Sequence, residues 1–71
     1  MKIIANKYTP GETIEIIRQW SELSQDDFGK KIGYKGRSAI SKIEGDITTI
    51  TFNKLMEIAK KENLVITIEK K

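Results

Sequence analysis

Residues 23–45, LSQDDFGKKIGYKGRSAISKIEG, contain two short helical patterns separated by a glycine-bounded turn. Ser24 is a favourable N-cap, and the two aspartates that follow Gln25 suit the positive end of a helix dipole. Phe28 and Ile32 are four residues apart, so they face the same side of this first helix. Gly33 supplies the left-handed conformation in which helices commonly end. We therefore predict a short helix that begins after Ser24 and ends before Gly33.

The second helical pattern of this stretch runs from Arg37 to about Glu44. Ile40 and Ile43 are three residues apart, and burying them leaves the opposite face of the helix in solvent. Gly29, inside the preceding helix, costs roughly 1 kcal/mol relative to Ala. We expect a second helix to cross so closely at Gly29 that a side chain would clash. Two short helices joined by a tight turn form the skeleton of a helix-turn-helix.

Helical patterns flank this pair on both sides. Thr9, Pro10 and Glu12 form a capping box with proline at the first helical position, which predicts a helix ending near Ser21. Thr51 is the cap of a fourth helix. The aromatic side chains of Trp20, Phe28 and Phe52 are expected in the core, whereas Tyr34, in the turn, could pack, bind a phosphate or do neither.

The segment 64–69 is rich in β-branched residues, which predicts a strand. Its expected partner is Lys2–Ala5 of the same chain or the same strand of a second chain. An unpaired apolar edge is an aggregation hazard, so we expect the strand to support a homodimer. The residues assigned to dimerisation are Leu64, Val65, Ile66, Thr67 and Ile68.

Composition narrows the function classes. The 71 residues are expected to form one domain, and without Cys or His they offer no disulfide and no thiolate or imidazole metal ligand. We therefore expect no metal and no cofactor. The chain lacks a Gly-rich phosphate loop, and Asp26–Asp27 is explained by its place at a helix start, so we do not expect an enzyme. No apolar run is long enough for a membrane span and no secretion signal is visible, so a cytoplasmic location is expected.

The charges are unevenly distributed along the chain. The formal net charge is +3, and every charged residue between Lys30 and Lys42 is basic. Between Glu12 and Glu22 the acids outnumber the single Arg18. This distribution predicts a positive face that would attract a polyanion and gain from counterion release. The alternative is that these lysines only keep the protein soluble.

The stretches Leu23–Gly33 and Ser38–Gly45 resemble the phage-repressor helix-turn-helix family, the lambda-repressor, Cro-like or xenobiotic-response-element type. The resemblance lies in the Leu-Ser-Gln start, the small residue at Gly29 and the Ile-Ser-Lys-Ile-Glu sequence, and it extends from about Thr9 to Leu64. It implies an all-α, four-helix domain over residues 1–71 with the helix-turn-helix at about 24–44 and a short C-terminal β-strand at about 64–69. Six residues, 34–39, stand where the family commonly has five, and we place the extra residue in the turn.

This resemblance implies a regulator of transcription, expected to be a repressor, that binds a two-fold site in double-stranded DNA as a homodimer. It also places a helix-one Arg18 against Glu44 as a structural ion pair and gives Gln25 a role in clamping the DNA backbone. The exposed helix face supplies base-reading candidates, unless it is only a solvated surface, and the helix start, turn and loop supply phosphate candidates. The base-reading candidates are Arg37, Ser38 and Lys42, and the phosphate candidates are Ser24, Gln25, Lys35, Thr48, Thr49 and Thr51.

A narrower likeness concerns the end of the chain. A fourth helix followed by the short strand Leu64–Ile68 is similar to the DNA-binding antitoxin of Hip-type toxin–antitoxin pairs. This likeness implies an alternative function, in which the protein neutralises a toxin partner and autoregulates its operon. A single-stranded or RNA binder is disfavoured, because the chain lacks the exposed aromatic row that such proteins use.

Overall fold

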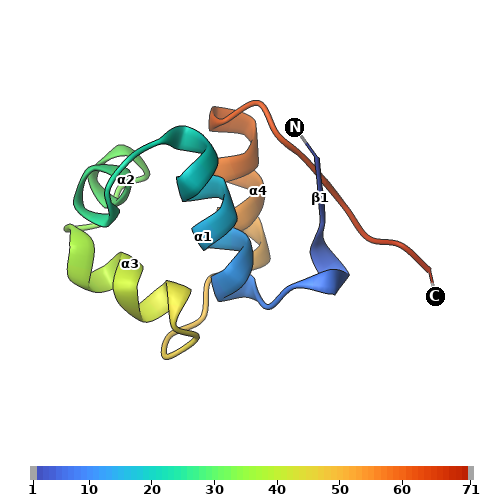
Figure 1. Ribbon diagram of the computed structural model, residues 1–71, viewed down its shortest axis with the longest axis horizontal. Coiled ribbons are helices and arrows are strands. Elements are labelled where there is room, and N and C mark those ends of the chain that lie inside the picture. Colours follow the sequence, from blue (N-terminus) through green and yellow to red (C-terminus); the bar gives the residue numbers. More distant parts are fainter. Residues whose placement is uncertain (1, 71) are drawn as a thin grey trace.

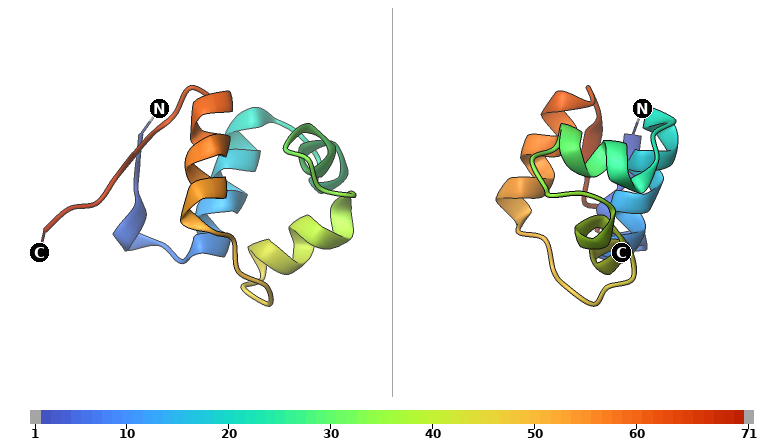
Figure 2. Two further views of the ribbon diagram at one scale, coloured as in Figure 1. Left: turned by 180° about the vertical axis from the view of Figure 1, so that it is seen from behind. Right: turned by 90° about the vertical axis from the view of Figure 1, so that its left-hand side faces the viewer.

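The computed structural model describes residues 2–70 and contains four helices, two short strands and one 3-10 turn within that range. Figure 1 shows two of the helices, α2 and α3, at one end of the molecule, α1 and α4 in the middle and the strands at the other end. The left view in Figure 2 shows the same order from behind, and the right view looks onto the α2–α3 end. The elements are β1 (Lys2–Ile4), the turn η1 (Ala5–Lys7), α1 (Pro10–Ser21), α2 (Gln25–Lys31), α3 (Arg37–Glu44), α4 (Phe52–Lys61) and β2 (Val65–Thr67).

Three helices begin at the caps that the sequence predicts. The Thr9 hydroxyl accepts a hydrogen bond from the Glu12 N–H at 3.1 Å, and the Glu12 carboxylate accepts one from the Thr9 N–H at 2.8 Å. Ser24 and Thr51 each accept a hydrogen bond from the N–H three residues further on, also at 3.1 Å. Helix α3 is different, because its N-cap is Gly36 and no side chain caps it.

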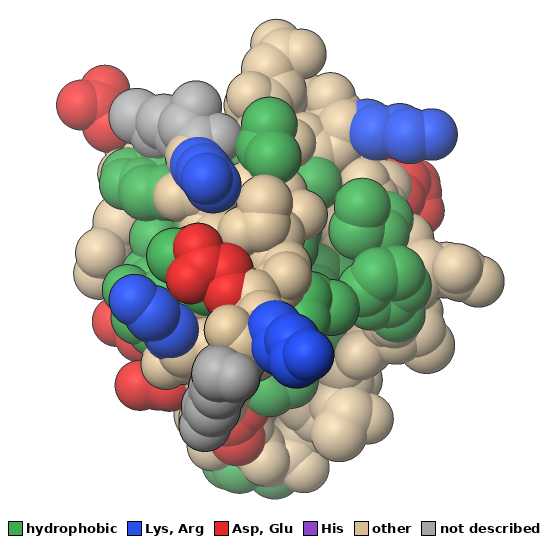
Figure 3. Space-filling model, turned by 90° about the vertical axis from the view of Figure 1, so that its right-hand side faces the viewer, with side chains coloured by type: hydrophobic (Ala, Val, Ile, Leu, Met, Phe, Trp, Pro, Cys, Tyr) green, Lys and Arg blue, Asp and Glu red, His purple; other side chains and the backbone are tan. Residues whose placement is uncertain are grey.

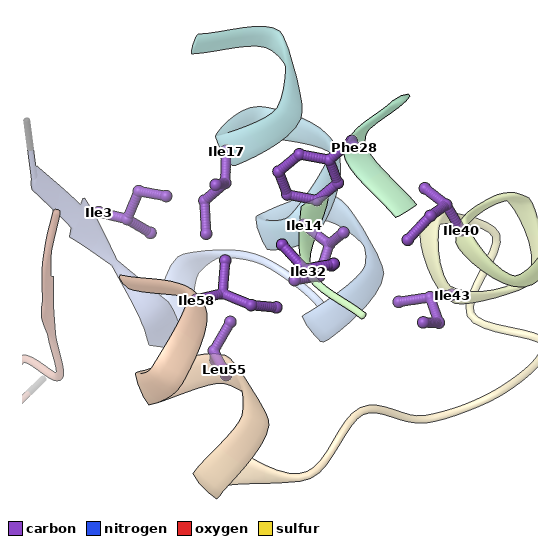
Figure 4. Close-up of a cluster of buried hydrophobic side chains, with 9 residues drawn as sticks. All are labelled: Ile3, Ile14, Ile17, Phe28, Ile32, Ile40, Ile43, Leu55 and Ile58. Carbon is purple, nitrogen blue, oxygen red and sulfur yellow. The ribbon is translucent and has the colours of Figure 1, made fainter. Parts of the chain in front are cut away.

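The core is built almost entirely from aliphatic side chains, and Figure 4 shows them converging from the helices and from β1. Phe28 of α2 is fully buried and is the one aromatic ring in this cluster. Ile3 brings the N-terminal strand into the same core with an exposure of 2%. The cluster consists of Ile3, Ile14, Ile17, Phe28, Ile32, Ile40, Ile43, Leu55 and Ile58.

The expectation that Trp20 and Phe52 lie in the core is wrong. Trp20 is 37% exposed and Phe52 is 62% exposed. Trp20 lies in the last turn of α1 and Phe52 is the first residue of α4, so both lie near an end of their helix and away from its centre. The inward faces at those centres carry buried aliphatic residues instead, Ile14 and Ile17 in α1 and Leu55 and Ile58 in α4.

The two strands pair within the chain, which was the first of the two expected alternatives. They are parallel, with Ile3 opposite Ile66, and only residues 65–67 of the expected 64–69 are in strand conformation. Asn6 continues the pairing beyond the ladder. Its side-chain amide donates to the Glu69 carbonyl at 2.7 Å and accepts from the Glu69 N–H at 3.2 Å.

Helices α2 and α3 approach closely at Gly29, as the sequence predicts. A Cβ added at Gly29 would lie 2.9 Å from the Gly36 carbonyl oxygen and 3.0 Å from Ile40 Cγ1. The first contact is with backbone, which cannot rotate away. Only a residue without a side chain permits this crossing.

Glu62, the C-cap of α4, connects three helices. Its carboxylate accepts a hydrogen bond from Lys31 Nζ at 2.8 Å and also bonds the Ser21 hydroxyl. Burial acts to raise the pKa of Glu62, but the hydrogen bonds from Lys31 and Ser21 outweigh it, so the pKa lies below its ordinary value of 4.5. The ionised carboxylate therefore holds the ends of α1, α2 and α4 together.

We predict that Gly29→Ala destabilises the protein although alanine is the better helix former. Overpacking of this kind costs about 1–3 kcal/mol, which offsets the roughly 1 kcal/mol gained in helix propensity. Urea denaturation would measure the free energy of unfolding. Lys30→Ala, at the neighbouring exposed position, is the control and should change that free energy by less than about 0.5 kcal/mol. A Gly29→Ala variant more stable than the wild type would contradict the close crossing.

Stability should fall in acid through Glu62. Because the folded-state pKa lies below the unfolded value, the contribution of Glu62 is complete above about pH 5 and is lost as the pH falls through the folded pKa. Thermal melts from about pH 6 to about pH 3 should show a shallower decline for Glu62→Gln than for the wild type. Glu57→Gln, an exposed acid on the same helix, is the control and should keep the wild-type slope. Equal slopes for all three proteins would contradict the role of Glu62.

Candidate nucleic-acid interface

Helix α3 has one buried face and one exposed face. Ile40 is fully buried and Ile43 is 4% exposed, so these two side chains fix the orientation of the helix. Arg37, Ser38 and Lys42 are exposed, and these are the three residues that the sequence proposes for reading bases. The structure thus places all three on the solvent side of a helix at the end of the molecule (Figure 1).

A hollow of about 480 Å³ lies beside this exposed face. It is bounded by the turn before α3, by α3 itself and by the loop that follows. Five of the residues proposed to contact bases or phosphates line it together with Tyr34, Ala39 and Ile43. These five are Lys35, Ser38, Lys42, Thr48 and Thr49.

The cations of this surface are not neutralised by the protein. Among residues 2–70, none of Lys35, Arg37 and Lys42 forms an ion pair. Two acids, Glu44 and Asp46, follow the basic segment and would weaken its positive potential if they faced outward. Glu44 is nearly buried and pairs with Arg18, whereas Asp46 stays exposed and bonds neutral groups of α1 and its cap, as described next. The three unpaired cations therefore outnumber Asp46, and the surface beside α3 stays net positive.

The Arg18 and Glu44 side chains meet between α1 and the end of α3. Arg18 Nε lies 2.6 Å from Glu44 Oε2, and the two side chains are 19% and 7% exposed. A second Arg18 nitrogen donates to Glu44 Oε1 at 3.2 Å, and a third donates to the Leu23 carbonyl at 3.2 Å. The hydrogen bond with Glu44 raises the pKa of Arg18 further above its ordinary value. The guanidinium therefore connects α1, the start of α2 and the end of α3.

Asp46 forms a second attachment that the sequence did not indicate. Its carboxylate accepts hydrogen bonds from the Thr9 hydroxyl at 2.7 Å and from the Gly11 N–H at 2.9 Å, at the positive end of α1. Gly11 permits the approach, because a Cβ there would clash with the Ile43 carbonyl oxygen and would lie 2.7 Å from Asp46 Oδ1. No local pattern could reveal this contact, since its partners are 35 or more residues apart in sequence.

The remaining phosphate candidates have structural bonds of their own. Ser24 and Thr51 are helix caps, and Gln25 Nε2 donates to Glu44 Oε1 at 3.1 Å. These three do not line the hollow beside α3. A role in binding phosphate stays a prediction for each of them. In Gln25 the side chain that would bind phosphate is the one that already contacts Glu44.

The turn between α2 and α3 contains two glycines in conformations that favour glycine. Gly33 and Gly36 have φ values of 91° and 141°, which L side chains rarely adopt. The Tyr34 N–H donates to the Gly29 carbonyl at 2.7 Å, and Lys54 Nζ lies 5.4 Å from the centroid of the Tyr34 ring. The turn is thus fastened both to α2 and to α4, and Tyr34 packs at the edge of the core while lining the hollow.

Two short helices that cross at Gly29, with the second presenting a free cationic face, define a helix-turn-helix protein. Comparison with known families agrees with this class: residues 14–61 match the helix-turn-helix family of the Cro/C1 type, and the chain belongs to that family. The matched domain is a DNA-binding domain and is not enzymatic. No curated protein and no solved structure matches the chain significantly.

Two further observations concern residues 2–70. None of the helices in this range has the length and apolar character needed to cross a membrane. The same range contains no cluster of three or more carboxylate, imidazole or thiol side chains suited to a metal ion.

Replacing Arg18 should show how strongly α3 depends on the Glu44 contact. Arg18→Met leaves the Glu44 carboxylate nearly buried with only Gln25 as a partner, which should lower the free energy of unfolding by about 3 kcal/mol. Lys30→Met breaks the exposed Lys30–Asp26 pair, 3.2 Å long, and should cost less than about 1 kcal/mol. Chemical denaturation of both variants would measure the difference, and equal losses would contradict the assignment.

Proposed function

We propose that the protein is a regulator of transcription that binds double-stranded DNA with α3 in the major groove. The observation that carries this proposal is the exposed face of α3, on which Arg37 and Lys42 have no ion-pair partner among residues 2–70. Membership of the Cro/C1-type helix-turn-helix family supports DNA as the ligand. The mode of action in this proposal is repression, in which the bound protein occupies a site that RNA polymerase needs.

Within this proposal the residues of α3 read base edges. Arg37 can form two hydrogen bonds to the O6 and N7 acceptors of guanine, and Lys42 can reach the same edge. Ser38 can donate to or accept from either kind of base pair. The neighbouring hollow receives the sugar–phosphate backbone, with Lys35 supplying charge and the Thr48 and Thr49 hydroxyls supplying hydrogen bonds.

The proposal includes two copies of the chain on one operator. A single recognition helix reads only a few base pairs, and a homodimer doubles this information with half-sites about one helical turn apart. The segment Leu64–Ile68 remains our candidate for a contact between copies. Its residues Val65 and Ile68 are 56% and 71% exposed although both are hydrophobic.

The test is to select bound duplexes from a random DNA pool and to measure binding by fluorescence anisotropy at several salt concentrations. Arg37→Ala should weaken binding to the selected site by about 1–3 kcal/mol and change non-specific binding little. Lys35→Ala should instead weaken both kinds of binding and reduce the salt slope by about one. Lys60→Ala, an exposed lysine on α4, is the control for the loss of one positive charge.

Two results would overturn the proposal. The first is a wild-type protein that retains no duplex in dilute salt. The second is an Arg37→Ala variant with an unchanged ratio of specific to non-specific affinity, which would remove α3 as the base-reading element.

A further inference from the structure

Asp46 lies where the chain leaves α3 and turns towards α4. Its φ is 58°, in the left-handed region that favours glycine. Aspartate tolerates this region better than most residues do, but glycine adopts it without a steric cost. The backbone conformation therefore does not by itself explain an aspartate at this position.

The Asp46 carboxylate joins this turn to the start of α1. Oδ1 accepts a hydrogen bond from the Gly11 N–H at 2.9 Å, and Oδ2 accepts one from the Thr9 hydroxyl at 2.7 Å. Thr9 is the N-cap of α1 and Gly11 belongs to its first turn, so both bonds end on the same helix terminus. Although the Asp46 side chain is exposed, its two oxygens are therefore attached to a regular element of the fold.

The turn that contains Asp46 folds back onto α3. The N–H groups of Ile47 and Thr48 both donate to the Lys42 carbonyl, at 2.9 Å and 3.3 Å. Thr48 and Thr49 line the hollow beside α3 together with Lys42. The Ile47 side chain is 76% exposed, so it does not hold the turn by apolar packing. The contacts that fix the turn are the bonds to the Lys42 carbonyl and the bonds of the Asp46 carboxylate to α1.

We propose that Asp46 is a positioning residue for DNA binding, whose carboxylate holds the turn against α1 and so sets where the Thr48 and Thr49 hydroxyls meet the phosphate backbone. Asp46 acts through the two threonines and makes no contact with DNA itself. The inference rests on the proposed function, because it concerns how that same surface binds the DNA backbone.

The negative charge of Asp46 gives this role a distinctive sign. Electrostatics alone predicts that removing an exposed acid near the cations of α3 strengthens binding to a polyanion. Loss of the two hydrogen bonds to α1 predicts the opposite, because the threonine hydroxyls would no longer be held in place. Variants of equal charge that differ only in hydrogen bonding separate the two effects.

The test compares Asp46→Asn with Asp46→Gly by fluorescence anisotropy, on the selected duplex and on a random duplex. Asparagine tolerates the left-handed conformation, and its amide offers an acceptor for the Gly11 N–H and a donor for the Thr9 hydroxyl oxygen. It should therefore rescue binding to at least the wild-type affinity. Glycine removes the same charge and fits the backbone, but it has no group that bonds α1. Asp46→Gly should bind both duplexes about tenfold more weakly than Asp46→Asn.

Two further readouts separate positioning of the turn from a general loss of structure. Phosphate contacts carry no sequence information, so the ratio of specific to non-specific affinity should be the same in both variants. The threonine contacts are uncharged, so the salt slope should also be the same. A lower ratio for Asp46→Gly would mean that α3 itself has moved, which would contradict the assignment.

A remote acid supplies the control for the loss of one negative charge. Figure 3 shows the end of the molecule that carries the strands, away from the α2–α3 pair, where acidic, basic and hydrophobic side chains are interspersed. Glu69 follows β2, is exposed and forms no ion pair within residues 2–70. Charges further from the DNA than the Debye length, about 8 Å at physiological salt, are largely screened. Glu69→Gln should therefore change either affinity by less than about twofold.

Amide hydrogen exchange, followed by NMR, measures the turn without DNA. The Ile47 N–H should exchange faster in Asp46→Gly than in Asp46→Asn, because its bond to the Lys42 carbonyl opens more often once the turn is released from α1. Equal exchange rates would overturn the inference, and so would equal DNA affinities of the two variants. A wild type that binds no duplex would instead contradict the proposed function, while the exchange rates would still show whether Asp46 holds the turn.

Discussion

The structure depends on holding one eight-residue helix, α3, in a fixed orientation while one of its faces stays in water. An isolated helix of this length is not stable in water, and α3 has no side-chain cap of its own. Its stability must therefore come from packing. Ile40 and Ile43 supply the buried face, and Gly29 lets α2 approach closely enough to cover Ile40. The exposed cations gain their common direction from these buried contacts.

Two carboxylates attach the C-terminal end of α3 to α1, each through a different kind of partner. Glu44 bonds a guanidinium from α1, and Asp46 bonds the N-terminus of α1 directly. The Glu44 carboxylate is nearly buried and pairs with the Arg18 cation, whereas Asp46 stays exposed and bonds neutral groups. Only the Glu44 contact therefore also removes an unpaired negative charge from beside the cations of α3.

Local signals predicted the parts of the fold that local chemistry decides. The caps Thr9, Ser24 and Thr51 act within four residues, so the sequence alone places the helix starts. The partner of β2 could not be chosen in advance, because a strand pattern does not say which distant strand it meets. Trp20 and Phe52 were misplaced for a related reason: helical periodicity gives the side on which a residue lies but not how far the neighbouring elements cover it.

The candidate site also has some features that local sequence predicts and others that it does not. The outward position of Arg37, Ser38 and Lys42 follows from the periodicity of one helix. The hollow that brings Lys35, Thr48 and Thr49 beside Ser38 and Lys42 depends on the path of the loop after α3, which no spacing rule describes. Asp46 could not be recognised as an anchor, because its partners lie at the other end of the helical segment.

The parallel pairing of residues 2–4 with residues 65–67 has a consequence for the order of events during synthesis. A parallel pair requires a long connection, and here the connection contains all four helices. Ile3 is therefore synthesised before all four helices, and its neighbour Ile66 is synthesised after them. The strand ladder can form only when the whole helical part has already been made.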